Sequence, residues 1–104
     1  MEVVIHGHQT EVTDVLKARA TDGVRKLNEH FQRLISADVR FEEDGVFKSV
    51  EVVVHAPRNT QLVARAESKY HETALNDAIA KLDAQIRKLK VSQKRQVHDT
   101  DLRA

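Results

Sequence analysis

The spacing of hydrophobic residues switches between a two-residue period and a 3.6-residue period along the chain, and this switching constrains the fold most strongly. Residues 2–6 alternate as in a short strand, and a helical stripe follows from Leu16 to Phe31. A second helical stripe extends from about Tyr70 to at least Lys90. Between the two stripes lie three strand-like stretches, at residues 34–41, 47–55 and 61–67. The predicted order is therefore strand, helix, three strands, helix.

Short turn sequences between the three consecutive strands predict how the sheet is connected. Glu43-Asp44-Gly45 and Pro57-Arg58-Asn59-Thr60 leave no room for a crossover, so these strands should form an antiparallel meander. The first strand is followed by a helix, which allows it to pair in parallel with one of the others. We predict an α+β fold: a β-α-β-β-β-α two-layer sandwich, in which two helices cover one face of a four-stranded mixed sheet.

Three residues carry more specific structural predictions. Thr13 is a suitable N-cap for the first helix, because its hydroxyl can accept a backbone N–H of the first turn. Gly23 lies inside that helix, where glycine costs about 1 kcal/mol relative to alanine, so we expect a large group to pack closely there. The phenylalanines, including Phe47, are predicted to be core residues.

The composition disfavours most kinds of catalytic site. The 104 residues suit a single domain, there are no cysteines, and no apolar run is long enough for a membrane helix. The N-terminus does not resemble a signal peptide. The six histidines lack the spacing of a metal site, and three glycines make no phosphate-binding loop. We therefore predict a cytoplasmic protein that is not an enzyme, with no catalytic residues, no metal and no cofactor.

Basic residues at helical spacing are the strongest functional signal. The net charge is only +1, but the segment from Lys81 to Arg95 contains six basic residues and only one acidic residue. Two ridges of cations flank the apolar stripes: Arg19, Lys26, His30 and Arg33 in the first helix, and Lys81, Lys88 and Arg95 in the second. These ridges either border one groove or share an exposed face. They predict phosphate contacts, and the scarcity of aromatic residues favours folded RNA over stacked single strands. The alternative is that they are ordinary solvating charges.

The chain resembles the ribosome hibernation-promoting factors, the family that includes ribosome-associated inhibitor A, over about residues 2–90. The resemblance rests on the order and spacing of several short matches: Ile5-His6-Gly7, Glu11-Val12-Thr13, Leu16-Lys17, Lys26-Leu27, Phe31, Ala64-Arg65-Ala66, Ala74-Leu75, Ile79, Lys81-Leu82, Gln85-Ile86 and Lys88. The fold that this resemblance implies is similar to a double-stranded-RNA-binding domain and agrees with the order predicted above.

The resemblance implies binding of the small ribosomal subunit, in the channel for messenger RNA and transfer RNA, with both helices facing 16S-type ribosomal RNA. Such binding would block translation and store inactive ribosomes under stress or in stationary phase. Basic family positions are matched by Lys17, Lys26, Lys81, Lys88 and Lys90. Gly23 and Ala84 stand where basic residues are common in the family, and compensation by Arg19, Arg25 and Arg87 is our hypothesis. We expect the second helix to contribute more than the first.

The resemblance also suggests how the chain is organised. We expect a single ribosome-binding domain at residues 1–90 and a flexible polar tail at residues 91–104, in a protein that acts as a monomer. Long family members carry a second, dimer-forming domain, which is not recognisable here. The chain is thus expected to be a short member, which either needs a separate modulation factor to pair ribosomes or keeps them single.

Two other classes of function remain open. A small-molecule or protein-interaction module with a split βαβ sheet would normally end in a strand, but the sequence from Val91 onward lacks β character. The other class is a protein-interaction regulator of the sigma-factor modulation type that does not bind ribosomes.

Overall fold

The computed structural model describes the backbone of residues 1–31 and 34–103 and the side chains of residues 1–30 and 34–88. Its elements follow the predicted order: β1 (Glu2–His8), α1 (Asp14–Phe31), β2 (Ser36–Asp44), β3 (Phe47–Ala56), β4 (Thr60–Ser68) and α2 (His71–Arg103). The Thr13 hydroxyl accepts a hydrogen bond from the backbone N–H of Leu16, at 3.2 Å. The predicted cap of the first helix is therefore confirmed.

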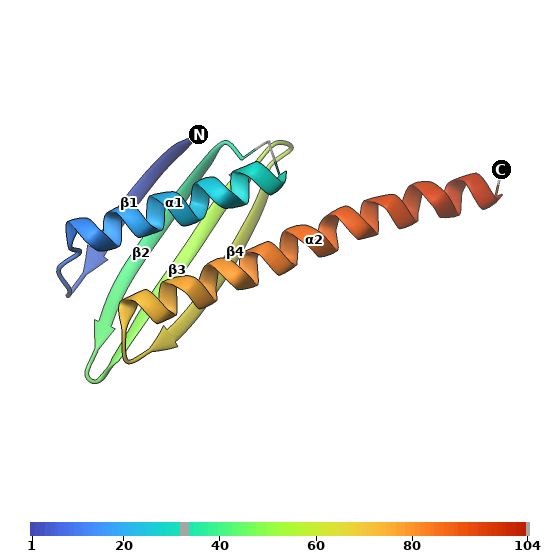
Figure 1. Ribbon diagram of the computed structural model, residues 1–104. Coiled ribbons are helices and arrows are strands. Elements are labelled where there is room, and N and C mark those ends of the chain that lie inside the picture. The colour runs from blue at the N-terminus through green and yellow to red at the C-terminus, as the bar shows by residue number, and fades with distance from the viewer. Residues whose placement is uncertain (32–33, 104) are drawn as a thin grey trace.

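The four strands form one mixed sheet in the order β1-β2-β3-β4. β1 pairs in parallel with β2, whereas β2, β3 and β4 form an antiparallel meander. Both helices lie on the same face of the sheet, side by side (Figure 1). The predicted α+β sandwich, with its open second face, is confirmed.

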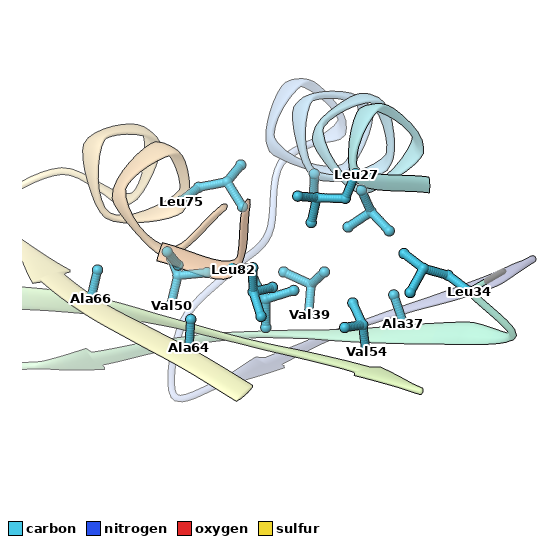
Figure 2. Packing of buried hydrophobic residues seen from close by; sticks show 14 of the residues in the cluster. Leu27, Leu34, Ala37, Val39, Val50, Val54, Ala64, Ala66, Leu75 and Leu82 are labelled. Carbon is cyan, nitrogen blue, oxygen red and sulfur yellow. The ribbon is translucent and has the colours of Figure 1, made fainter. Parts of the chain in front are cut away.

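The core fills the space between the helices and the covered face of the sheet, as Figure 2 shows. The largest fully buried side chains are Phe41, Leu27, Leu75, Leu82, Ile86, Val24, Val39, Val50, Val52 and Val54. Small buried residues recur where α2 crosses β4, namely Ala64 and Ala66 on the strand and Ala74 and Ala78 on the helix. Short side chains allow a helix to lie close to a sheet, so these alanines favour a close approach of α2 to β4.

α1 and α2 approach each other closely at Gly23. A Cβ atom placed on Gly23 would overlap Cδ1 of Ile79. The absence of a side chain at this position therefore lets the branched side chain of Ile79 rest on the backbone of α1. The helix-destabilising glycine is explained by this packing, as the sequence led us to expect, and the large group is the second helix itself.

One residue expected in the core is exposed. Phe41 is fully buried, but Phe47 keeps 56% of its surface accessible, so its assignment to the core was wrong. Val50, Val52 and Val54 face the helices, and side chains alternate along a strand, so Phe47 belongs to the open face. The side chain of the third phenylalanine, Phe31, lies outside the described residues.

The backbone of α2 continues as a helix to Arg103, beyond the edge of the sheet (Figure 1). The polar sequence predicts a flexible tail from residue 91. No glycine or proline occurs between residues 91 and 104, so no residue there is a strong helix breaker. The division into a domain of residues 1–90 and a tail of residues 91–104 stays a prediction. Within the described residues, no helix is long and apolar enough to cross a bilayer.

The packing at Gly23 leads to a prediction about coupled substitutions. In a wild-type background, Gly23→Ala should gain less than the roughly 1 kcal/mol expected from helix propensity, because the added methyl displaces Ile79. In an Ile79→Ala background, the same substitution should recover that gain. Urea denaturation of the four proteins would measure the coupling. Additive effects on the free energy of unfolding would show that Ile79 does not restrict position 23.

Candidate nucleic-acid interface

The candidate cations are all on the two helices, and every one with a described side chain is exposed. These seven are Lys17, Arg19, Arg25, Lys26, Lys81, Arg87 and Lys88. The eighth, Lys90, belongs to the helical backbone of α2, but its side chain lies outside the described residues. The structure separates the seven into three groups, which differ in the partners that each cation meets; Arg87 belongs to the second group through its pair with Asp83.

The first group lies on the side of α1 away from α2 and is here called the outer flank. It contains Lys17 and Arg25. Gly23 faces α2, and two residues along a helix correspond to a rotation of about 200°, so Arg25 points away from α2. Lys17 is two residues from Arg19, which lines the groove towards α2, so Lys17 also points away from α2. Among the described residues neither cation has an ion-pair partner, so both remain available for an external anion.

The second group borders a groove of about 480 Å³ between the helices. Arg19, Lys26 and His30 line it from α1, and Asn76, Ile79 and Asp83 line it from α2. Carboxylates of α2 pair with Arg19 and with His30, the second contact being an ion pair only when His30 is protonated. Arg19 Nη1 lies 2.7 Å from Glu72 Oε1. The groove therefore has mixed charge, and it is less positive than the spacing of its cations along α1 suggests.

Asp83 joins the two helices at the far end of this groove. Its Oδ1 accepts from Nδ1 of His30 at 3.0 Å, and its Oδ2 lies 2.9 Å from Nη2 of Arg87. The side chain of Asp83 is only 22% exposed, so it is well placed to hold both partners. Lys26, by contrast, has no ion pair within the part of the chain whose side chains are described.

The third group lies on the flank of α2 that covers β4, and it contains Lys81 and Lys88. Lys81 Nζ donates to the carbonyl oxygen of Arg65 at 2.8 Å, and the Gln85 side-chain amide donates to that of Val63 at 2.9 Å. β4 is an edge strand, and its outer carbonyls would otherwise lack partners from the sheet. Lys81 therefore has a structural role, although an ammonium group retains two further donors.

The two basic ridges predicted from the sequence do not border one groove. The α1 ridge lines the interhelical groove, whereas Lys81 and Lys88 lie on the opposite side of α2, above the edge of the sheet. Both ridges belong to the helical layer. The side chains of Arg33 and Arg95 lie outside the described residues.

The opposite face of the sheet has alternating charges. Arg40 on β2 is paired in register with Glu51 on β3, which is paired in turn with Arg65 on β4. Asp38 and Glu67 add further negative charge on this face. Such an arrangement suits a polyanion less well than the helical layer does.

The histidines include one buried residue that sequence analysis did not single out. His71 begins α2 and donates from Nε2 to the backbone carbonyl of Glu42 at 3.1 Å. Its ring packs edge-on against Phe41, with the centroids 5.3 Å apart. His71 thus ties the start of α2 to β2. Within the described residues, no three or more side chains of His, Asp or Glu gather in a way that could hold a metal ion.

The carboxylates that pair with basic residues across the groove were not predicted from the sequence. Only the Asp83–Arg87 pair was visible, because its members are four residues apart on one helix. The pairs that Asp83 and Glu72 form with α1 join residues that are distant along the chain. No local sequence pattern predicts such contacts.

Comparison with known proteins identifies the class of protein. The family model described as "Sigma 54 modulation protein / S30EA ribosomal protein" matches residues 3–94. The chain belongs to this family, and the resemblance inferred from the sequence is confirmed. The family is non-enzymatic, in agreement with the prediction that the chain is not an enzyme.

Individual relatives are named for ribosome hibernation. The chain is similar to the ribosome hibernation promoting factor of Azotobacter vinelandii, with 32% identity over 93 residues, 89% of this chain and 86% of the relative. It is 28% identical to the factor of Pseudomonas putida, over 89% of this chain and 90% of the relative.

Solved structures share the fold. A ribosomal subunit interface protein from Coxiella burnetii matches with a TM-score of 0.81 and 19% identity, over 88% of this chain and 99% of that chain. The N-terminal domain of Protein Y from Thermus thermophilus matches with a TM-score of 0.78 and 19% identity, over 86% and 99%. These likenesses support the α+β architecture described above.

The capping of β4 by Lys81 leads to a prediction with a matched control. Lys81→Met should lower the free energy of unfolding by about 0.5–1 kcal/mol, because an exposed charge-assisted hydrogen bond to the edge strand is lost. Lys88→Met removes the same charge from the same flank and should change stability by less than about 0.5 kcal/mol. Urea denaturation would compare the two variants. Equal effects would show that the contact with the Arg65 carbonyl contributes nothing.

Proposed function

We propose that the chain is a ribosome hibernation factor that binds the small ribosomal subunit through the basic residues of its helical layer. The observation that carries this proposal is that all seven candidate cations with described side chains are exposed on the helices, while the open face has mixed charge. The names of the relatives, ribosome hibernation promoting factor and ribosomal subunit interface protein, support the ribosome as the partner.

The proposed mechanism is occupation rather than catalysis. A domain bound to ribosomal RNA in the channel for messenger RNA and transfer RNA would exclude both and keep the ribosome inactive. Lysine and arginine side chains would contact phosphates and release counterions, so binding should weaken steeply with salt. Such contacts place a protein on folded RNA by its shape and charge, and no cofactor takes part.

The distribution of free cations shifts the proposed contact surface towards α1. Lys17, Arg25 and Lys26 have no ion pair among the described residues, whereas Arg87 is paired with Asp83 and Lys81 caps the edge of the sheet. A cation beside a carboxylate attracts a phosphate less strongly, because the negative charge of its partner lowers the local positive potential. We therefore propose that α1 contributes at least as much as α2, contrary to the expectation from sequence. Lys88 and Lys90 complete the proposed surface.

Cellular context follows from the same proposal. Binding to the ribosome would keep the protein in the cytoplasm, where it would act as a monomer on each small subunit. A separate modulation factor is the partner we propose for any pairing of two ribosomes.

The competing function is regulation of a protein partner, of the sigma-factor modulation type, without ribosome binding. The description of the matching family names both a sigma 54 modulation protein and a ribosomal protein, which keeps this alternative in view. The two functions differ in where the protein is found in the cell.

Sedimentation would distinguish them. In a sucrose gradient of a stationary-phase lysate at moderate salt, the protein should migrate with small subunits or whole ribosomes, because its phosphate contacts persist under these conditions. Migration with paired ribosomes would indicate pairing, and migration with single particles would indicate storage without pairing. Detection of the protein solely in the soluble fractions would rule out the ribosomal function.

The contribution of the outer flank can be tested by charge reversal. Lys17→Glu with Arg25→Glu should weaken binding to purified small subunits by about tenfold or more, and should reduce the dependence of log affinity on log salt by at least about one unit. Arg58→Glu with Lys69→Glu makes the same change in charge at exposed positions outside the two helices. This control should bind within about twofold of the wild type. Equal losses in both variants would show that net charge, and not the outer flank, determines binding.

A further inference from the structure

Three large apolar side chains are exposed at the same end of the sheet. Val46, Phe47 and Tyr70 keep 71%, 56% and 69% of their surfaces accessible, and they are here called the tip patch. Large hydrophobic residues in the rest of the described chain are mostly buried in the core. A local group of exposed apolar residues is a common sign of an interaction site.

The topology brings these residues together from two parts of the chain. Val46 and Phe47 belong to the β2–β3 hairpin, in which Asp44 and Phe47 form the last pair. The β3–β4 ladder ends at the neighbouring pair, Lys48 with Ser68, so Tyr70 follows only two residues beyond it. Figure 1 shows the hairpin and the start of α2 at the same end of the molecule.

The backbone holds the tip patch in place. The hairpin turn is only two residues long, and Gly45 adopts a φ of +61°, a conformation that suits glycine in a tight turn. Val46 is thereby carried to the end of the turn, away from the core. At Tyr70 the backbone N–H donates to Ser68 Oγ at 3.4 Å, and the carbonyl accepts from Ala74 N–H at 3.1 Å. Little conformational freedom of the backbone would therefore be lost on binding.

The charge around the tip patch is negative, opposite to that of the helical layer. Within the hairpin, residues 42–48, three carboxylates (Glu42, Glu43 and Asp44) are accompanied by one lysine, a net charge of −2. Beside the hairpin, Glu67 is paired with Arg65 at 3.7 Å and Glu72 with Arg19 at 2.7 Å, and Lys69 adds one positive charge. Lys48 is itself paired with Glu43, at 3.5 Å. Among the described residues, Asp44 at the turn has no ion pair. Phosphate groups would be repelled here, although the aromatic rings alone would suit a nucleic-acid base.

We propose that the tip patch docks a lysine- and arginine-rich protein segment that carries an apolar or aromatic side chain. The apolar side chain of the partner would cover Val46 and Phe47, while its cations meet Asp44 and the ring of Tyr70. This inference goes beyond the proposed function, since it concerns a protein partner and a surface of opposite charge. The patch is small, so the contact is a weak or auxiliary one.

A defined peptide probe tests the proposal on the whole chain. The probe is a fluorescein-labelled peptide of alternating arginine and leucine, followed by fluorescence anisotropy. Phe47→Ser with Tyr70→Ser should weaken its binding by about fivefold or more, as expected for loss of central apolar contacts. Asp44→Lys, at an exposed turn position, should weaken it by a similar factor through charge repulsion. Thermal melting and circular dichroism would verify that each variant is folded.

Matched controls separate the tip patch from other surfaces. Ile35→Ser removes an equally exposed apolar side chain at the opposite end of the sheet and should leave binding unchanged. A peptide with serine in place of leucine should bind more weakly than the probe. Amide chemical shifts of the labelled protein should change within residues 43–48 and 68–72.

Four outcomes would overturn the proposal: no measurable binding of the probe, equal binding of the serine peptide, shifts confined to the interhelical groove, or stronger binding of a single-stranded oligonucleotide at the tip patch. The last of these would assign the patch to nucleic acid.

Discussion

Ile79 of α2 rests on the backbone of α1 at Gly23, so the two helices approach each other closely at this point. Near this contact the carboxylates of α2 reach basic side chains of α1, in the pairs of Arg19 with Glu72 and of His30 with Asp83, the second an ion pair only when His30 is protonated. The cations of the groove are thereby neutralised within the molecule. The accessible positive charge is left on the flanks of the helical layer and at Lys26, and the proposed contact with ribosomal RNA depends on this arrangement.

The covered face of the sheet and its edge at β4 both support the helical layer. The covered face holds the core, so the helices above it can present charge on a rigid support. The edge of that support at β4 is closed by Lys81 and Gln85, which donate to two outer carbonyls of the strand. A lysine that resembles a phosphate ligand in the sequence therefore also protects a sheet edge, and these two roles must be separated when variants are interpreted.

Local sequence patterns predicted much of the fold. Alternation identified the strands, the 3.6-residue stripes identified the helices, and Thr13 marked the start of α1 because capping depends on neighbouring residues alone. The exposure of Phe47 was missed, since a phenylalanine next to a run of valines suggests core. Its position on the open face follows from the parity of the strand and from where the helices end, and the helices are placed by tertiary packing.

The sequence by itself determined the order of the elements, the family, and the identity of the basic residues on the helices. Only the tertiary structure decided which of these cations are free. His30 and Asp83 are 53 residues apart, and Lys81 meets a carbonyl of another element, so neither contact is encoded in a local repeat. Periodicity records which side of an element is apolar, but ion pairs between elements depend on the distance at which the elements pack, and here a glycine allows the isoleucine of the other helix to come close.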